Sequence, residues 1–442
     1  MSDTQHYAEM KDSGIKWIGR VPAGWSVRTL YQLATRVNNK NADLAEQNLL
    51  SLSYGKIKRK DINTSDGLLP ASFDGYNIIE AGDIVLRLTD LQNDHTSLRV
   101  GHATEKGIIT SAYTTLRPIN PAHSRYLYYL IHAFDLKKGF YGMGAGVRQG
   151  LNYDEVKELR IVLPSQKEQD NIVDFLDSKC SQIDILIQEA KANLDEYKEW
   201  KDAIVTESVN KGLDCSVKRK TIGLPGLDEI PTNYLIAPVR WLISLLTDYT
   251  ANGSFGDLAK NVTYRDSPDY ARLVRLTDLR VDFENDGVYV DEHAYNYLSK
   301  SSLFGGEILL ANVGAYAGFA VEMPKVNFLA TLGPNMFLLK MDPKYWDQHF
   351  AYYSLTGQFC HQQLILLANK TTAQPKLNKD NFKSISTVLP PLDEQKSIAG
   401  YLDCKCSAIN QIIKEKEDLL ADLEAYKCSL IYETVTGKRK VV

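Results

Sequence analysis

The chain has 442 residues, more than one hydrophobic core usually holds, so we expect about two to four domains. With 44% hydrophobic and 24% charged residues the composition is globular, and no apolar run approaches the roughly 20 residues of a membrane span. The first residues are polar, which argues against a secretory signal. The six cysteines do not stand at metal-ligand spacing, so we expect a reducing, cytoplasmic environment and no metal site.

The charged residues are distributed unevenly along the chain. The net charge of −4 argues against a general nucleic-acid coat. Residues 1–150, however, carry 18 Lys and Arg against 14 Asp and Glu, whereas residues 151–215 carry 8 against 15. Because the acidity is concentrated in the second segment, the globular parts are free to bind phosphate locally.

Residues 1–163 form the first predicted globular domain. Within it, Gly82-Asp83-Ile84-Val85-Leu86 combines a turn residue with a β-branched apolar run, which predicts a buried strand after a tight turn. A polar loop containing Arg148 and Gln149 precedes Leu151-Asn152. Loops on rigid scaffolds commonly carry recognition, so this loop is a candidate binding element.

Residues 164–215 predict one long helix. Pro164 fits a first helical turn, and no proline follows it in this segment. At about 1.5 Å per residue, a helix of about 44 residues spans roughly 65 Å. Its apolar positions alternate spacings of four and three, which is a heptad seam. The seam residues are Leu176, Cys180, Ile183, Ile187, Leu194 and Tyr197.

Residues 216–389 and 390–442 repeat this arrangement of a globular domain and a long helix. Leu151-Asn152 and Glu168-Gln169 recur 226 residues later as Leu377-Asn378 and Glu394-Gln395. Gly306-Glu307-Ile308-Leu309-Leu310 likewise matches the first turn and strand. The second seam consists of Leu402, Cys406, Ile409, Ile413, Leu420 and Leu423. Chance does not keep one register over so many residues, so the chain is a tandem duplication.

A helix with an apolar seam needs a partner, and the simplest partner is the other copy. The return path through residues 216–390 allows an antiparallel pair with one domain at each end. A parallel pair is equally reachable by the chain. The pattern alone leaves both arrangements open.

The sequence contains no recognisable catalytic site. The phosphate-binding Gly-x-x-x-x-Gly-Lys-[Ser/Thr] loop and the Asn/Asp-Pro-Pro-aromatic tetrad of adenine methyltransferases are both absent. Gly142, Gly144 and Gly146 lack the strand-then-helix context of a dinucleotide-binding loop. Asp269 and Glu307 lack the lysine at Glu-x-Lys spacing that a nuclease site would need. We therefore predict no catalytic residues and no cofactor bound by this chain.

The repeated motifs together resemble the specificity subunit of type I restriction-modification systems. The resemblance rests on elements that are present twice: a variable domain, a loop that ends in Leu-Asn, then Leu-Pro, Glu-Gln and a long helix. In the first copy they are Gly150-Leu151-Asn152, Leu163-Pro164 and Glu168-Gln169; in the second copy Lys376 stands where the first has Gly150. The segments Asp12–Gly19 and Leu389–Gln395 are also similar to this family. Ser165-Gln166-Lys167 departs slightly from the usual Pro-Leu-x.

This resemblance implies an α+β fold. Two α/β target-recognition domains would alternate with two long helices that pair as an antiparallel coiled coil. Each domain would read one half of an asymmetric bipartite DNA target, and the helix length would set the gap between the halves. Two methyltransferase subunits would dock on the helices and modify one adenine on each strand, and a motor-nuclease subunit would join them. S-adenosylmethionine, ATP and Mg are expected on those partners, so this chain is expected to be no enzyme.

Hydrogen bonds in the major groove would read the bases, with Arg to guanine and Asn or Gln to adenine, while Lys and Arg hold phosphate. In the first domain the candidate DNA-binding residues are Lys56, Lys58, Arg59, Arg99, Arg148 and Gln149. In the second domain they are Arg265, Arg272, Arg275, Asn312, Gln374 and Lys376.

Two other classes of protein compete with this interpretation. A structural adaptor with two protein-binding domains would show no sequence-dependent DNA retention. A self-contained endonuclease would need a metal-binding carboxylate cluster, which the sequence does not contain.

Overall fold

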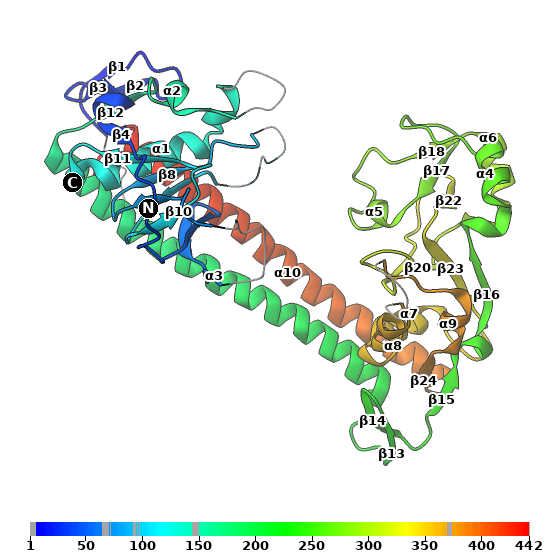
Figure 1. Ribbon diagram of the computed structural model, residues 1–442. Coiled ribbons are helices and arrows are strands. Elements are labelled where there is room, and N and C mark those ends of the chain that lie inside the picture. The colour runs from blue at the N-terminus through cyan, green and yellow to red at the C-terminus, as the bar shows by residue number, and fades with distance from the viewer. Residues whose placement is uncertain are drawn as a thin grey trace. The chain divides into compact units, whose positions relative to one another are not determined.

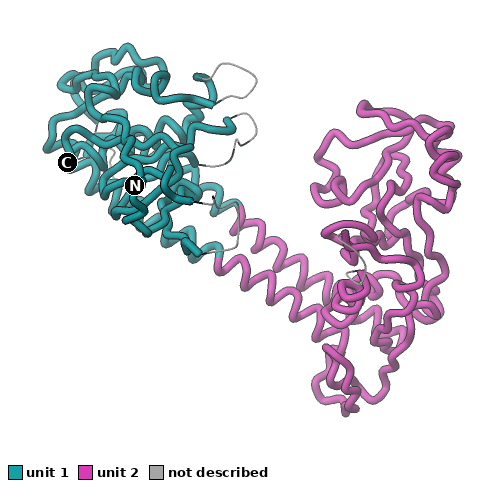
Figure 2. The backbone as a smooth tube through the Cα atoms, in the orientation of Figure 1, with its two compact units in different colours: residues 1–191, 418–442 teal, residues 192–417 magenta. Residues whose placement is uncertain are grey.

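The computed structural model describes residues 6–63, 70, 72–91, 94, 96, 98–143, 150–368 and 374–441 (Figure 1). The chain divides into two compact units, residues 1–191 with 418–442 (unit 1) and residues 192–417 (unit 2) (Figure 2). Each unit contains one globular domain and a part of both long helices. No helix within the described residues has the length and apolar character needed to cross a membrane.

Unit 1 is built around a four-stranded antiparallel sheet in the order β4-β11-β8-β9. These strands are β4 (Ala34–Arg36), β11 (Thr114–Pro118), β8 (Ile84–Leu86) and β9 (Val100–His102). Four antiparallel pairs flank the sheet: β1 (Met10–Asp12) with β2 (Arg20–Pro22), β3 (Ser26–Thr29) with β12 (Arg160–Leu163), β5 (Leu50–Ser53) with β6 (Lys56–Arg59), and β7 (Asn77–Ile79) with β10 (Gly107–Ile109). The short helices are α1 (Ser124–Leu136) and α2 (Tyr153–Val156).

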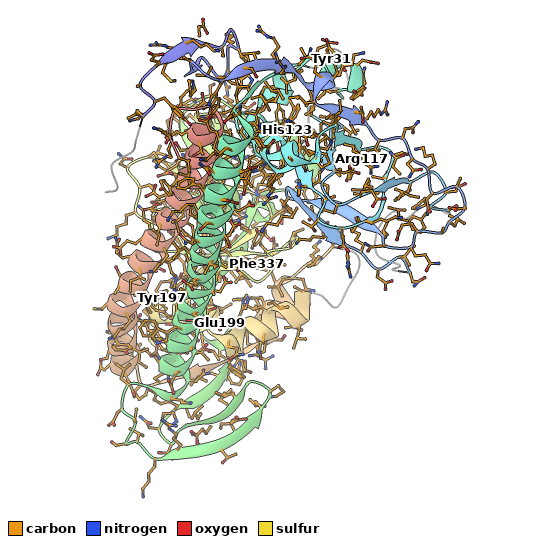
Figure 3. The ribbon with its side chains drawn as sticks, turned by 90° about the vertical axis from the view of Figure 1, so that its left-hand side faces the viewer. Tyr31, Arg117, His123, Tyr197, Glu199 and Phe337 are labelled. Atoms are coloured by element: carbon orange, nitrogen blue, oxygen red, sulfur yellow. The ribbon has the colours of Figure 1, made fainter. Side chains whose placement is uncertain are left out.

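The buried strand predicted from Gly82-Asp83-Ile84-Val85-Leu86 is confirmed as β8, whose three residues are all 0% exposed. Gly82 has a positive φ of 95°, which a side chain would disfavour, and it makes the turn. The Asp83 carboxylate accepts two hydrogen bonds from Arg117 on β11, at 2.8 and 2.7 Å. Figure 3 labels Arg117. This pair neutralises a buried carboxylate next to the sheet.

Unit 2 contains two four-stranded sheets, in the orders β16-β23-β20-β21 and β18-β17-β22-β19. The first consists of β16 (Ile243–Asp248), β23 (Met336–Met341), β20 (Ile308–Ala311) and β21 (Ala320–Glu322). The second consists of β18 (Tyr289–Val290), β17 (Ala271–Val274), β22 (Ala330–Leu332) and β19 (Ser302–Leu303), in which β17 and β22 run parallel. Two further pairs are β13 (Arg219–Leu224) with β14 (Leu227–Pro231) and β15 (Leu235–Pro238) with β24 (Ser386–Leu389). The short helices are α4 (Phe255–Asn261), α5 (Leu276–Leu279), α6 (Glu292–Tyr297), α7 (Gln348–Thr356), α8 (Gln358–Ala368) and α9 (Lys379–Ser384).

The two long helices are α3 (Gln166–Lys211) and α10 (Leu392–Val435), and they lie within the predicted segments 164–215 and 390–442. In unit 1, Lys191 and Lys427 reach Glu424 and Asp184 across the pair, at 3.5 and 2.5 Å. In unit 2, Lys198 Nζ lies 3.7 Å from Glu417 Oε1, and Lys201 donates to Asn410 at 2.8 Å. In each unit the residue numbers rise on α3 as they fall on α10, so the helices are antiparallel, as the resemblance implied.

The predicted seam residues face the interior of the helix pair to different degrees. Seven are buried, namely Leu176, Cys180, Ile183, Leu194, Leu402, Cys406 and Ile409. Five are half-buried, namely Ile187, Tyr197, Ile413, Leu420 and Leu423. In unit 1 the seam of α3 shares one core with Leu430, Ile431 and Val435 of α10. Each globular domain therefore packs on both long helices, which stabilises the pair as well as the domain.

The repeated Glu-Gln motif fastens each long helix to its own domain. Gln169 and Gln395 are 1% and 0% exposed, and their amides donate to Pro164 O at 3.0 Å and Pro390 O at 2.9 Å. Their side-chain oxygens lie 2.9 Å from His123 Nδ1 and 2.8 Å from Asp347 N, at the starts of α1 and α7. Each buried glutamine thus satisfies one polar group just before its own long helix and another just before the neighbouring helix, α1 or α7.

Candidate functional site

The β5–β6 hairpin of unit 1 presents basic side chains. Its two-residue turn, Tyr54-Gly55, has positive φ at both positions, the geometry that suits a tight hairpin. Lys56 and Lys58 are exposed on β6, and Lys56 Nζ lies 3.9 Å from Asp184 Oδ2 on α3. Arg59 is also exposed, but its Nε donates to Glu105 at 2.8 Å, so part of its charge is already neutralised. Lys58 is therefore the more available cation.

Arg99 does not lie on a binding surface, which corrects the sequence prediction. It is 0% exposed, and its guanidinium donates to the carbonyls of residues 87, 89, 90 and 94 at 2.6 to 3.2 Å. Its Nε also donates to the Tyr141 hydroxyl at 3.1 Å. Since its donors are used internally, Arg99 organises the loop after β8 and cannot read a DNA groove in this conformation.

Arg272 is a second correction of the same kind. It is 6% exposed and donates to the carbonyl and the side-chain oxygen of Asn285, at 3.1 and 2.6 Å. Its guanidinium lies over the ring of Phe283, 4.9 Å from the centroid, and 3.5 Å from Asp278 Oδ1. These contacts make Arg272 part of the packing behind α5.

Two other candidates in unit 2 are already paired with carboxylates. Arg265 is exposed and lies 3.0 and 3.1 Å from Asp269 and Asp291. Arg275, the residue before α5, holds Asp278 with two hydrogen bonds of 3.1 Å each. Burial opposes ionisation of Asp278, but the hydrogen bonds from Arg275 and Asn285 outweigh it and lower the pKa of this carboxyl.

The loop candidates of unit 2 do come together. Leu377 N donates to Asn312 O at 2.8 Å, Gly314 N donates to Pro375 O at 2.9 Å, and Val313 forms a bridge with Lys376. The loop after β20 therefore lies against the loop that carries Gln374 and Lys376, which are both exposed. Asn312 Oδ1 is buried and has no hydrogen-bond partner within the described part of the chain, so a water or ligand could satisfy it.

Unit 1 has the same backbone junction at the corresponding place. Leu151 N donates to Leu88 O at 2.8 Å, directly after β8. The candidates Arg148 and Gln149 belong to the adjoining loop, and they lie outside the described residues.

Sequence reasoning missed three exposed residues beside these loops. Arg280, which follows α5, lies over the ring of Tyr316, 4.5 Å from the centroid, and Tyr316 is 46% exposed in the loop after β20. Tyr54, at the tip of the β5–β6 hairpin, is 77% exposed. The loop position after the Gly-x-Ile strand was a signal for Tyr316, whereas nothing in the sequence distinguished Arg280 from other surface arginines.

The unit 2 cluster combines groups that can bind the phosphates of DNA with groups that can contact its bases. We define it as Arg280, Tyr316, Asn312 and Lys376. It offers guanidinium, ammonium, amide and aromatic groups, which can hold phosphate, hydrogen-bond base edges and stack. Among the residues that the structure describes, no three His, Cys, Asp or Glu side chains are grouped to hold a metal ion. Glu307 accepts from the backbone of Phe304 and Gly305 and lies 3.7 Å from Lys340, so it serves the turn before β20.

A family model for the type I restriction modification DNA specificity domain matches residues 22–194 and 274–421, once in each half and over more than half of the chain. The chain therefore belongs to the family of type I restriction-modification DNA specificity proteins. It is a type I restriction-modification specificity subunit that carries two DNA specificity domains.

Two relatives from Methanocaldococcus jannaschii are similar over most of their length. The MjaX type I restriction enzyme specificity subunit, whose name is provisional, is 23% identical over 96% of both chains. The MjaVIII type I restriction enzyme specificity subunit is 22% identical over 89% of this chain and 84% of its own. A solved chain, described in connection with complex assembly and conformational transition of the type I R-M system, has a TM-score of 0.62. It is 13% identical over 94% of this chain and 98% of its own, which shows a shared fold.

Proposed function

We propose that this chain is a non-catalytic subunit that gives a type I complex its DNA target, with each domain reading one half of an asymmetric bipartite sequence. The observation that carries the proposal is the match of the specificity-domain model to both halves of the chain. The two domains differ in their strands and loops, so the two half-sites should differ as well. Recognition of two separated halves suits a protein with two domains joined by rigid elements.

The long helices are proposed to dock two methyltransferase subunits and to set the spacing of the half-sites. The support is the equivalence of the two domain junctions, in which Gln169 and Gln395 make the same contacts. Matching junctions would offer matching platforms to two copies of one partner. A helix is stiff at this length, so it is suited to fixing a distance.

The chemistry would reside on the partners. The methyltransferase subunits would bind S-adenosylmethionine and methylate one adenine on each strand. A motor-nuclease subunit would bind ATP and Mg and add restriction. This chain would supply the DNA contacts, with Lys58 in unit 1 and the unit 2 cluster as the first residues to test.

The test is genome-wide mapping of methylated adenine by long-read sequencing, in cells that express the partner subunits with and without this chain. We expect one bipartite motif, methylated once on each strand, that depends on the chain. If the partners are expressed and no methylated motif depends on it, the proposed function is wrong.

A further inference from the structure

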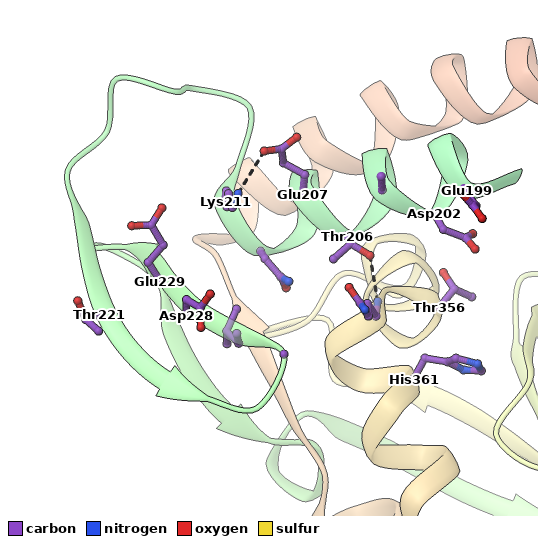
Figure 4. A pocket seen from close by; sticks show the side chains of 15 residues that line it. Glu199, Asp202, Thr206, Glu207, Lys211, Thr221, Asp228, Glu229, Thr356 and His361 are labelled. Carbon is purple, nitrogen blue, oxygen red and sulfur yellow. Dashed lines mark hydrogen bonds and ion pairs between the residues drawn. The ribbon is translucent and has the colours of Figure 1, made fainter. Parts of the chain in front are cut away.

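Unit 2 contains a groove of about 930 Å³, and no residue of the unit 2 cluster lines it. Its walls come from the last turns of α3, the β13–β14 hairpin, and the helices α7 and α8 (Figure 4). The helix wall carries Glu199, Asp202 and Glu207, and the hairpin wall carries Asp228 and Glu229. Lys211 is the one lysine or arginine among the lining residues.

Three of the five carboxylates have no cation to balance them. Glu207 lies 3.2 Å from Lys211, and Glu229 lies 2.6 Å from Arg219. Among the described residues, Glu199, Asp202 and Asp228 have no ion pair or side-chain hydrogen bond, and all three are exposed. These three unpaired carboxylates come from two facing walls, and they make the local potential negative.

A buried polar side chain in the same groove also lacks a partner. Asn210 lines the groove and is only 7% exposed, yet no hydrogen bond of its side chain occurs within the described residues. The amide atoms of Asn210 are not completely shielded from solvent, so they are available to hydrogen-bond a group that the groove receives. The acidic walls and the amide are independent observations of the same place.

In unit 1 the region that corresponds to the groove is filled by side chains of the chain itself. These side chains indicate which kind of group the groove of unit 2 could bind. Tyr432, Phe134 and Lys137 stand there where unit 2 has Thr206, Gln358 and His361. The ring centroids of Tyr432 and Trp17 lie 6.3 Å apart, and Lys137 Nζ lies 4.6 Å from the centroid of the Tyr432 ring. Large side chains therefore occupy the volume that small and polar ones leave open in unit 2.

Basic residues complete the filling in unit 1. Lys438, which follows α10, donates to Ile18 O and Arg20 O of the β1–β2 hairpin at 2.7 and 2.9 Å. Arg439 lies 3.2 Å from Glu433, the carboxylate that corresponds to Glu207. The chain thus places a Lys-Arg pair between its own helix end and hairpin in one copy of the repeat and leaves the other copy acidic and open.

We propose that the groove of unit 2 binds a Lys- or Arg-rich segment of a partner protein, in the way that unit 1 binds its own Lys438 and Arg439. The ammonium and guanidinium groups would pair with Glu199, Asp202 and Asp228, and a backbone carbonyl or amide of the segment would satisfy Asn210. The proposal does not depend on DNA recognition.

The test uses the full-length chain and a fluorescein-labelled peptide of sequence GKRKVV, which is the basic end of this chain. Fluorescence anisotropy at low and at physiological salt gives its dissociation constant. The variant E199Q/D202N/D228N is expected to weaken binding about tenfold, roughly the effect of losing three exposed charge pairs. The peptide GQQQVV, without basic residues, is expected not to bind.

The matched control is E189Q/D195N/E196Q, which removes three charges from exposed positions of α3 outside the groove. It is expected to leave the dissociation constant unchanged. Equal weakening by both triple variants would overturn the proposal, because general acidity would then explain binding. Absence of peptide binding by the unmodified chain would also overturn it. Because the assay contains no DNA, these outcomes leave the proposed DNA recognition to its own test.

Discussion

Asp177 on α3 and Asp403 on α10 occupy the same position of the repeat, and each accepts from one tyrosine and faces one basic side chain. Tyr129 and Arg125 of α1 reach Asp177 at 2.5 and 2.6 Å. In unit 2, Tyr353 and His349 of α7 reach Asp403 at 2.8 and 2.6 Å. The junction of unit 1 is thus closed by an arginine that stays charged, whereas the junction of unit 2 is closed by a group that titrates.

We predict that the α7 junction of unit 2 weakens as the pH rises through the raised pKa of His349. Burial opposes the charged form of His349, but hydrogen bonds to Asp403 and Glu322 outweigh it and raise the pKa of the imidazole. A raised pKa means that this contribution to stability is complete below the ordinary histidine value of about 6.5 and is lost as the pH rises through the folded-state value. Tyr353 stays neutral there, because burial and its hydrogen bond to Asp403 raise its pKa. Hydrogen exchange of the α7 amides against pH measures the effect.

The control for this pH dependence is the variant H349Q. The protection factors of its α7 amides, which are corrected for the intrinsic pH dependence of exchange, should be insensitive to pH in that window. The variant R125H should introduce a similar dependence into α1 of unit 1. An H349Q protein with the same pH profile as the unmodified chain would contradict the assignment.

We predict that R99A destabilises unit 1 by about 3 kcal/mol or more, because four partly buried backbone carbonyls lose their donor. K58A, which changes an exposed residue, should alter the free energy of unfolding by less than about 0.5 kcal/mol. Urea denaturation of both variants makes the comparison. A small effect of R99A would mean that the loop after β8 keeps its conformation without the hydrogen bonds from Arg99.

The sequence predicted the helices and their seam because a heptad pattern is local and repeats. The repeated Glu-Gln motif was also recognisable in the sequence, but its structural role could not be predicted. The reason lies in tertiary contacts, since Gln169 meets the start of α1 more than 40 residues away in the chain. The antiparallel arrangement also came from the resemblance and not from the pattern, because seam residues look the same in both orientations.

The candidate site was predicted less well than the fold. Arg99 and Arg272 carry no sequence signal of burial, because their acceptors are backbone carbonyls and an amide that loop conformation brings to them. Asn312 and Lys376 lie in loops next to repeated landmarks, which the sequence makes recognisable, and their part in DNA binding stays a prediction. Arg280 was missed because its partner, Tyr316, is distant in sequence.

We predict that R280A relaxes the half-site read by unit 2 and leaves the other half-site unchanged. Loss of one base contact typically costs about 1–3 kcal/mol of discrimination. K376A should instead weaken DNA binding for all sequences and reduce the salt slope by about 1. Methylation mapping and salt-dependent binding of the assembled complex distinguish the two outcomes. If R280A relaxed the half-site of unit 1, the assignment of the cluster to unit 2's half-site would be wrong.

Lengthening both long helices should lengthen the gap in the DNA target. A heptad inserted within residues 192–197 of α3 and another within 418–423 of α10 preserve the seam period, and they add about 10 Å of helix. If helix length alone sets the spacing, the gap grows by about 3 base pairs at 3.4 Å per step while both half-sites stay the same. A heptad inserted in α3 alone should abolish methylation, because the ion pairs Lys191–Glu424 and Lys198–Glu417 could not both form. An unchanged gap in the double insertion would show that the partners, and not these helices, fix the distance between the half-sites.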